Sequence, residues 1–308
     1  YHGYWPVDSR KVDSRFGNGE NLKTLINTAH HHNISVLLDF VSNHIHEDHP
    51  YYQYHSDWYG NVELADGSLN IRNWSEEYML TTWFETFLPS YDYVNSPAAI
   101  EKVVGDAVFW IEEYGFDGFR QDATKHVPHN FWKSLRNKLD EKFPDKDPFQ
   151  IGETFGSDEL ISSFVNPGEL DSQFNFSLYY LLRNQLIEED IDFNSIHKGI
   201  RDNLQQYQPL NLMGTITSSH DQVRFISLAD SQIKLNENPT ERAFHNPPGA
   251  VTDDSSYEKL FMFMAMNMAL PGVPVVYYGE EIGMMGAGDP DNRRMMRFED
   301  ALTERENS

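Results

Sequence analysis

Strand and helix patterns alternate along this sequence, and that order restricts the fold more than any other feature. Segments with helical periodicity are followed by short apolar runs rich in β-branched residues, which are typical of buried parallel strands. The six candidate strands are ISVLLDF, FDGFRQD, FQIGETF, LDSQFNF, LMGTITSSHD and GVPVVYYG. This alternation predicts an α/β fold with a parallel sheet and helical crossovers. Six strands are compatible with an open doubly wound sheet and with a barrel that lacks its first two strands.

Helix boundaries are marked by ordinary capping residues. In SPAAIEKVVGDAVFWIEEYG, Ser96 can cap the start, Pro97 suits the first helical position and Gly115 suits the end. In NLKTLINTAHHHN, apolar residues recur with helical spacing and Asn33 can end the helix. Residues 45–95 have no such period and are rich in Tyr, Trp, His, Gly and Asn, so we expect an irregular inserted subdomain there.

Composition argues against several classes of function. The 308 residues include 48 acidic and 24 basic ones, and the net charge of −24 disfavours a nucleic-acid partner because it repels phosphate backbones. The absence of cysteine rules out disulfides, cysteine–zinc sites and thiol catalysis. No apolar run approaches the roughly 20 residues of a membrane-spanning helix. The length suits one large domain or two smaller ones.

Three acidic residues lie at the carboxyl ends of predicted strands: Asp122, Glu153 and Asp221. Each taken alone could be a solvated acid, but in a (β/α)8 barrel this end carries catalysis. Alternation along a strand places Arg120 on the same face as Asp122, and a cation that close favours the ionised carboxylate. Asp122 could then act as a nucleophile while Glu153, in a more apolar environment, stays protonated. Two such carboxylates roughly 5–5.5 Å apart are what retaining glycoside hydrolysis requires.

Seven short motifs of the chain resemble, in order, stretches of the α-amylase family (glycoside hydrolase family 13). They are YHGYWPVD, DFVSNH, GFRQDATKH, GETF, SSHDQ, GVPVVYYGEE and GDPDNRR. The resemblance covers nearly the whole chain and implies a (β/α)8 TIM barrel of which strands 3 to 8 are present. It also implies a retaining enzyme that cleaves α-1,4-glucosidic bonds in starch-type α-glucans or maltooligosaccharides through a covalent glycosyl-enzyme.

The resemblance assigns roles to individual residues. Asp122 corresponds to the nucleophile, Glu153 to the general acid/base, and Asp221 to the acid that stabilises the oxocarbenium-like transition state. Arg120 corresponds to the arginine that orients the nucleophile. The other residues that the resemblance places at the substrate are His2, Tyr4, His44, Lys125, His126, His220, Asp289 and Arg293.

Some of these positions bear on specificity. Lys125 and His126 match a pair on the leaving-group side that the family's α-1,6-glucosidases usually lack, so they favour an α-1,4-glucan enzyme. Asp39 is expected to shape the strand end rather than to touch substrate. Four aromatic residues of the irregular segment could stack on sugar rings or form a small core: Trp58, Tyr59, Trp74 and Trp83.

The resemblance also predicts the domain organisation. Residues 1–44 and 96–308 correspond to the catalytic barrel, incomplete at its N-terminus, and residues 45–95 correspond to the family's inserted domain B. The family's C-terminal β-domain is absent from this chain. We expect the natural protein to be longer, because a six-stranded fragment would leave strand edges unpaired.

Many members of the family bind a structural calcium ion, and the resemblance places Asn43 and the backbone carbonyl of His126 among its ligands. This chain has Ser90, in LPSYD, where the family has an aspartate ligand. Calcium prefers several oxygen ligands, carboxylates above all, so the calcium site is in question. The family's neopullulanase-like members also lack it, and both Ser219 and GDPDNRR point toward that group. No organic cofactor is expected.

Other hypotheses are compatible with parts of the sequence. His44, His46, Asp48 and His49 form an H-x-H-x-D-H pattern, which resembles the dinuclear zinc signature of the metallo-β-lactamase family. That reading needs further histidine and aspartate ligands, for which the sequence offers no pattern. A non-catalytic glucan-binding relative is a second hypothesis, although such relatives usually lose one of the three acids. Neopullulanase, cyclomaltodextrinase and α-glucanotransferase activities on the same scaffold also stay open.

Overall fold

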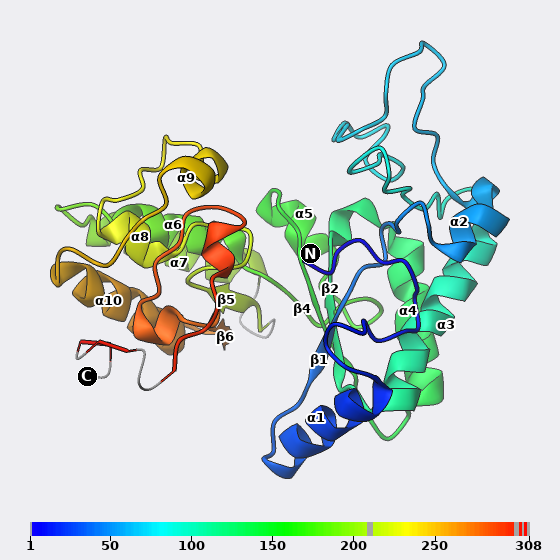
Figure 1. Cartoon of the computed structure of the whole chain (residues 1–308), viewed down its shortest axis with the longest axis horizontal. Coiled ribbons are helices and arrows are strands. Elements are labelled where there is room, and N and C mark those ends of the chain that lie inside the picture. Colours follow the sequence, from blue (N-terminus) through cyan, green and yellow to red (C-terminus); the bar gives the residue numbers. More distant parts are fainter. Residues whose placement is uncertain (1, 208–211, 299–301, 304, 307–308) are drawn as a thin grey trace. The chain divides into compact units, whose positions relative to one another are not determined.

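The computed structural model describes residues 2–207, 212–298, 302–303 and 305–306 (Figure 1). The chain divides into two compact units, Tyr1–Gln173 and Phe174–Ser308. All six predicted strands are present, and every pair that these strands form is parallel. Within the described ranges, the helices are all too short or too polar to span a bilayer.

The first unit is built on a parallel sheet of four strands in the order β1-β2-β3-β4. Their bounds are Leu37–Phe40 for β1, Gly118–Gln121 for β2, Phe149–Gly152 for β3 and Ser172–Gln173 for β4. Gly118 of β2 lies opposite both Leu37 of β1 and Phe149 of β3. A doubly wound sheet reverses its strand order at a switch point, whereas the strands of a barrel follow one another in sequence. The sequential order therefore favours the barrel.

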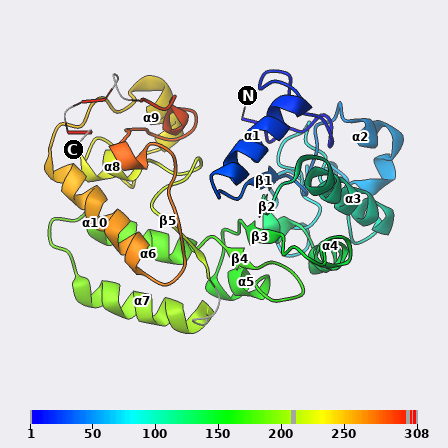
Figure 2. The same cartoon turned by 90° about the horizontal axis from the view of Figure 1, so that it is seen from below.

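Helices α3 and α4 lie side by side and enclose the apolar core of the first unit (Figures 1 and 2). The helices of this unit are α1 (Gly19–His31), α2 (Pro50–Tyr54), α3 (Pro97–Tyr114), α4 (His129–Lys142) and α5 (Asp158–Ser163). Val104 of α3 and Leu135 of α4 are buried in one cluster with Phe119 of β2. This core packs against the sheet through residues such as Phe40 of β1 and Phe119 of β2.

The predicted helix ends are largely confirmed. Asn33 follows α1 with a φ of 59°, and Gly115 ends α3 with a φ of 84°, both in the left-handed region that closes helices. Pro97 occupies the first turn of α3 as predicted. The prediction for Ser96 was wrong in detail, because its hydroxyl donates to the carbonyl of Asp57 instead of capping α3.

Residues 45–95 are irregular, as the sequence predicts. Apart from α2 and a short 3-10 turn at Ser56–Trp58, this segment contains only turns and isolated bridges. Trp58, Tyr59 and Trp83 of this segment are 9% exposed or less, and Trp58 and Tyr59 belong to the main apolar core of the first unit. The assignment of this segment to a separate domain stays a prediction.

The second unit pairs β5 (Gly214–Ile216) with β6 (Val273–Val275) in parallel. Its helices are α6 (Phe176–Leu186), α7 (Phe193–Tyr207), α8 (Phe225–Ala229), α9 (Pro239–His245) and α10 (Ser255–Ala269). Helix α6 packs against α7, α10 and β5. The Asn/Pro-rich composition of the segment between β5 and α10 indicates a loop, but the segment contains α8 and α9. Asn238 caps α9 and Pro239 starts it, so a capping signal was present.

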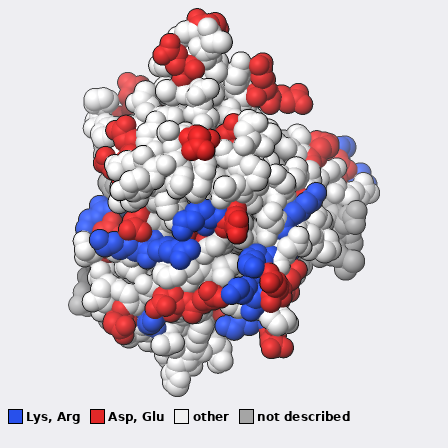
Figure 3. Space-filling model, turned by 90° about the vertical axis from the view of Figure 1, so that its right-hand side faces the viewer, with Lys and Arg blue, Asp and Glu red and all other residues white. Residues whose placement is uncertain are grey.

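Charge on the face seen in Figure 3 is mixed. Acidic side chains lie among the basic ones and also gather at the top of this view. Acidic and basic side chains also alternate on α3 and α4, which carry the ion pairs Lys138–Glu141 and Lys142–Glu112. This face therefore offers no uninterrupted basic surface of the kind that nucleic-acid binding uses.

Candidate active site

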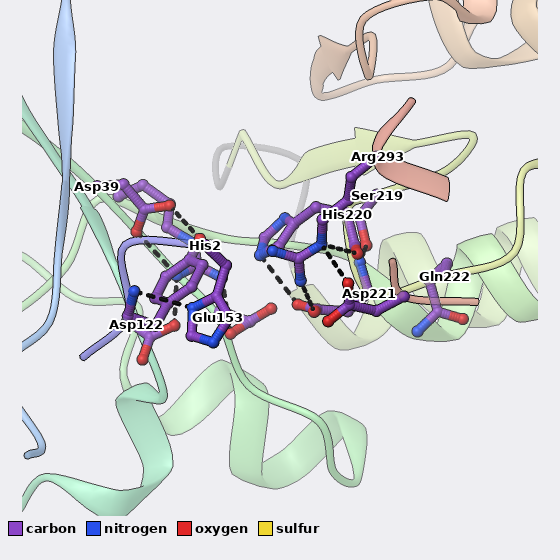
Figure 4. Close-up of polar contacts among 12 residues, drawn as sticks. His2, Asp39, Asp122, Glu153, Ser219, His220, Asp221, Gln222 and Arg293 are labelled. Atoms are coloured by element: carbon purple, nitrogen blue, oxygen red, sulfur yellow. Dashed lines mark hydrogen bonds and ion pairs between the residues drawn. The ribbon is translucent and has the colours of Figure 1, made fainter. Parts of the chain in front are cut away.

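The first three strands bring three carboxylates around one guanidinium (Figure 4). Asp39 lies in β1, Asp122 directly follows β2, and Glu153 directly follows β3. From Arg120, Nη1 lies 2.5 Å from Oδ1 of Asp122 and 2.9 Å from Oδ1 of Asp39, and Nη2 lies 2.7 Å from Oε2 of Glu153. The predicted placement of Arg120 and Asp122 on one strand face is confirmed. The structure also brings Glu153 to the same cation, which the sequence did not predict.

The charge of Arg120 is fixed by its surroundings. Burial lowers the pKa of its guanidinium, but Glu153, Asp39 and Asp122 outweigh that effect and raise the pKa well above its usual range. The side chains of Arg120, Asp122 and Glu153 are all about one-tenth exposed. The planar guanidinium contacts Asp122 with Nη1 and Glu153 with Nη2, so one side chain holds both carboxylates.

The turn after β2 connects the two carboxylate positions. The hydroxyl of Thr124 donates to the carbonyl of Gln121 at 3.1 Å and accepts from the amide of Glu153 at 3.0 Å. The amide of Thr124 donates to the carbonyl of Glu153 at 2.9 Å. Ala123, between Asp122 and Thr124, has a φ of 48°, a left-handed conformation that is unusual for alanine. Sequence reasoning missed Thr124, whose only signal is its place two residues after Asp122.

The N-terminal segment lies against this cluster. The hydroxyl of Tyr4 donates to Oδ2 of Asp39 at 2.5 Å, and its ring centre lies 5.6 Å from Cζ of Arg120. Nε2 of His44 lies 2.9 Å from the carbonyl of Tyr4, and Nδ1 of His2 accepts from the amide of Tyr4. Burial raises the pKa of the Tyr4 phenol well above its usual range, so the hydroxyl keeps its proton. Asp39 therefore holds Arg120 and Tyr4, in keeping with its predicted structural role.

Two of the three histidines predicted at the site in the first unit, His44 and His126, are buried and neutral. Burial lowers the pKa of His44, and it lowers the pKa of His126 to about 4. Nδ1 of His126 lies 2.9 Å from the carbonyl of Met79 and must donate to it, which leaves Nε2 as an acceptor. Both imidazoles have their ring centres 5.1 Å from that of Phe84. Lys125, one residue before His126, donates to the carbonyl of Phe155 at 2.7 Å, and burial lowers the pKa of its ammonium.

Of the four aromatic candidates in the irregular segment, Trp58, Tyr59 and Trp83 are buried and one is exposed. Trp74 is 49% exposed. Its ring centre lies 4.8 Å from that of His126 and 5.3 Å from that of Phe84, which it meets edge to face. Trp74 is therefore an exposed indole held beside a predicted substrate-binding residue.

The second unit assembles its four predicted site residues into one cluster (Figure 4). Asp221 lies in the loop after β5, where Nε2 of His220 is 3.0 Å from its Oδ2 and Nη2 of Arg293 is 3.0 Å from its Oδ1. Nε of Arg293 lies 3.3 Å from Oδ1 of Asp289. Arg293 belongs to the 3-10 turn Asp291–Arg293. One guanidinium therefore joins the two aspartates.

The residues around Asn43 do not fit a calcium site well. Its Nδ2 lies 3.4 Å from Oγ of Ser90 and 3.3 Å from Nδ1 of His44, and all three side chains are buried. Both of these neighbours are neutral, whereas calcium selects carboxylate-rich oxygen sites.

The four residues of the zinc-like pattern point to different partners. His44 contacts the carbonyl of Tyr4, while His49 contacts Oγ of Ser9 with Nε2 and accepts from the amide of Tyr51 with Nδ1. Nδ1 of His46 accepts from the amide of Asp48. Within the described part of the chain, no three His, Asp or Glu side chains converge as a metal site would require. The zinc hypothesis therefore finds no support in the geometry.

The chain is similar in sequence and in fold to known proteins of one enzyme family. The family model for the alpha amylase catalytic domain matches residues 1–307. A cyclomaltodextrin glucanotransferase of Geobacillus stearothermophilus is 30% identical over 315 residues, which cover 96% of this chain and 40% of that protein. The solved alpha-amylase from Geobacillus thermoleovorans, complexed with acarbose, has a TM-score of 0.81 at 29% identity, covering 100% of this chain and 62% of that one.

A solved cyclomaltodextrinase has a TM-score of 0.78 at 23% identity, covering 99% of this chain and 48% of that one, and supports the fold alone. The chain thus spans less than two thirds of each of these three relatives. The family match, in contrast, extends over almost every residue. The chain therefore belongs to the alpha-amylase family of glycoside hydrolases, family 13, and has the (β/α)8-barrel class of fold.

Proposed function

We propose that this chain is the catalytic part of a retaining glycoside hydrolase that cleaves α-1,4-glucosidic bonds in starch-type α-glucans or maltooligosaccharides. The observation that carries the proposal is the pair of buried carboxylates, Asp122 and Glu153, on adjacent parallel strands and in contact with one guanidinium. Retaining hydrolysis uses two carboxylates close together, one as nucleophile and one as acid/base. Family membership supports an α-glucan as the substrate class.

In the first step, Glu153 gives its proton to the glycosidic oxygen while a carboxylate oxygen of Asp122 attacks the anomeric carbon. The bond from that carbon to the leaving sugar breaks, and its electron pair stays on the oxygen that Glu153 protonates. A β-linked glycosyl ester of Asp122 forms, and the leaving sugar departs with a new hydroxyl.

In the second step, the ionised Glu153 takes a proton from water, whose oxygen attacks the anomeric carbon and releases Asp122 as a carboxylate. Two inversions at the same carbon leave the product in the α configuration. Asp221 is proposed to hold sugar hydroxyls and to stabilise the positive charge of the transition state. The proposed sugar-binding side chains are His2, Tyr4, His44, Lys125, His126, His220, Asp289 and Arg293.

The contact between Arg120 and Glu153 opposes the acid role of Glu153. A cation at 2.7 Å favours the ionised carboxylate, whereas the first step needs the protonated one. We expect substrate to separate this pair, with the glycosidic oxygen replacing Arg120 as the partner of Glu153. Arg120 would then stay on Asp122 and Asp39 through Nη1.

Glycosyl transfer is the second candidate, and the identity with a cyclomaltodextrin glucanotransferase favours it. In transfer, a sugar hydroxyl replaces water in the second step while the same residues act. Neopullulanase or cyclomaltodextrinase specificity is a further alternative, because Ser219 and GDPDNRR resemble the neopullulanase-like members of the family. Chromatography of the products from starch, pullulan and β-cyclodextrin separates these activities, since transfer yields longer or cyclic glucans and hydrolysis yields shorter linear ones.

Asp122→Asn and Glu153→Gln test the proposal. Each is expected to lower turnover of a maltooligosaccharide by several orders of magnitude, with the melting temperature retained. Asp171→Asn is a matched control, because Asp171 also accepts from a buried arginine, Arg136, at 2.5 Å but lies outside the cluster. Near-wild-type turnover in either site variant would contradict the assigned roles.

A further inference from the structure

The side chain of Asn292 holds the backbone on both sides of Asp221. Nδ2 of Asn292 lies 2.8 Å from the carbonyl of His220 and 2.8 Å from the carbonyl of Gln222, the residues that flank Asp221 in sequence. Asn292 is fully buried. One amide therefore restrains both peptide groups next to a proposed active-site carboxylate.

The direction of this amide follows from its partners. Both are carbonyl oxygens, which only accept, so the group facing them must be the NH2 and not the oxygen. Oδ1 of Asn292 is buried without a hydrogen-bond partner, and such a group costs free energy. An apolar residue would avoid that cost but would release both carbonyls. The hydrogen bonds to the two carbonyls therefore explain why a buried asparagine occupies position 292.

The backbone of Asn292 is fixed in turn. Its carbonyl accepts from Nε of Arg224 at 3.0 Å and from the hydroxyl of Tyr277 at 3.3 Å. Arg224 is fully buried and donates through Nη1 to the carbonyl of Tyr278. A Cβ at Gly286 would lie 2.7 Å from Cα of Asn292, so the approach of these two segments depends on glycine. These contacts fix the backbone of Asn292, whose side chain restrains the segment around Asp221.

The loop that carries Asn292 also carries the cation of the cluster. Arg293 contacts Asp221 through Nη2 and the carbonyl of His220 through Nε, at 3.0 and 3.1 Å. The carbonyl of His220 thus accepts from two consecutive residues of one turn. The side chain of Arg293 reaches the Asp221 carboxylate directly, whereas Asn292 acts only on the main chain around it.

We propose that Asn292 is a positioning residue for the active site, setting the backbone, and through it the carboxylate and imidazole, of Asp221 and His220. This inference rests on the proposed function of Asp221 in α-glucan cleavage. A misplacement of about 1 Å at a group that acts in the transition state lowers rates by about 100-fold. Asn292 is therefore expected to act on turnover without touching substrate.

The first test is hydrolysis of maltoheptaose by Asn292→Ala. We expect kcat to fall about 10- to 100-fold, with KM changed less than about threefold. The matched control is Asn203→Ala, since Asn203 is also a buried asparagine with two hydrogen bonds, to Asn175 at 2.8 and 3.0 Å, away from the cluster. Equal losses of kcat in the two variants would overturn the positioning role. Asn292→Leu, which fills the volume, serves if Asn292→Ala does not fold.

A double-mutant comparison separates positioning from general loosening of the fold. In the background Asp221→Asn, Asn292→Ala is expected to lower kcat by less than about twofold, because the carboxylate that it positions is already gone. An undiminished 10- to 100-fold fall in that background would overturn the proposal.

A readout without turnover distinguishes this proposal from the proposed function. The NMR resonance of Nε2 of His220 reports its contact with Asp221, at 3.0 Å. We expect that resonance to shift in Asn292→Ala and in Asn292→Leu but not in Asn203→Ala. An unshifted resonance would overturn the positioning role even if the wild type hydrolyses maltoheptaose. A wild type that cleaves no α-glucan would refute the proposed function, while the NMR comparison would still decide the positioning.

Discussion

Nη1 of Arg120 lies 2.5 Å from Oδ1 of Asp122, and both side chains are nearly enclosed. Strand alternation alone aligns the two residues, which are two positions apart at the end of β2. The bond holds the carboxylate of Asp122 in one orientation. The same guanidinium reaches Glu153 with Nη2, so its planar shape matters as much as its charge.

Arg120→Lys tests that shape. A lysine keeps the charge but cannot bridge two carboxylates with a rigid fork, so we expect kcat/KM for a maltooligosaccharide to fall by about 100-fold or more. Arg136→Lys is the control, because Arg136 is an equally buried arginine that binds Asp171 and backbone carbonyls outside the site. If both variants retained wild-type kinetics, Arg120 would not have the role described.

Trp74→Ala tests the exposed indole beside His126. A sugar ring stacked on this indole would bury apolar surface and so contribute roughly 1–2 kcal/mol to the free energy of binding. Loss of that contribution is expected to raise KM for long maltooligosaccharides about 5- to 30-fold. The expected effect on kcat is small, because the contact is the same in ground and transition states. Tyr54→Ala removes another exposed aromatic ring, on α2, and is expected to leave KM unchanged. Equal KM values for wild type and Trp74→Ala would exclude the stacking role.

The buried Glu280 is expected to make stability depend on pH. Burial raises its pKa to about 7, although Arg224, 3.6 Å away, acts in the opposite direction. Between pH 4.5 and 7 the unfolded chain releases a proton that the folded chain keeps, so stability falls as pH rises, by about 3 kcal/mol from this group. Glu280→Gln is expected to remove that contribution, so that the variant is the more stable protein at pH 8.

Denaturant unfolding of wild type and Glu280→Gln at pH 5 and pH 8 measures this difference. Glu101→Gln, at an exposed position of α3, is the control and is expected to follow the wild-type pH dependence. Parallel pH profiles for wild type and Glu280→Gln would contradict the assignment.

Chelation tests the calcium question. Because Asn43 contacts Ser90 and not a carboxylate, we propose that calcium is not required. Dialysis against EDTA is expected to leave both the melting temperature and the turnover number unchanged. A fall in the melting temperature that added calcium reverses would show that other oxygen ligands complete a site.

Much of the fold was predictable because its signals are local. The apolar strands and the residues that end α1 and α3 act through backbone preferences of single positions, such as Asn33 and Gly115. Helices α8 and α9 were missed because the surrounding Asn/Pro-rich composition obscured the capping signal at Asn238. Leu25 is one of the apolar residues that recur with helical spacing in α1, yet it is 57% exposed, so that spacing predicted the helix but not which of its residues are buried.

Residue identity and the order of the motifs along the chain were enough to predict which acidic residues belong to the site, but not how the site residues contact one another. The motifs pointed to Asp122, Glu153 and Asp221, and strand alternation paired Arg120 with Asp122. The bridge from Arg120 to Glu153 and the restraint of Asp221 by Asn292 depend on side-chain reach between segments that are distant in sequence. No periodicity or spacing encodes such contacts, so they become visible only in three dimensions.

The anomeric configuration of the first product distinguishes a double displacement through Asp122 from a single displacement by water. Wild-type protein is mixed with a maltooligosaccharide, and the newly formed reducing end is followed by proton NMR before mutarotation equilibrates the anomers. With a double displacement, we expect the α-anomer to appear first and the β-anomer to grow only at the rate of mutarotation. Initial appearance of the β-anomer would mean a single displacement by water and would contradict the role of Asp122 as nucleophile.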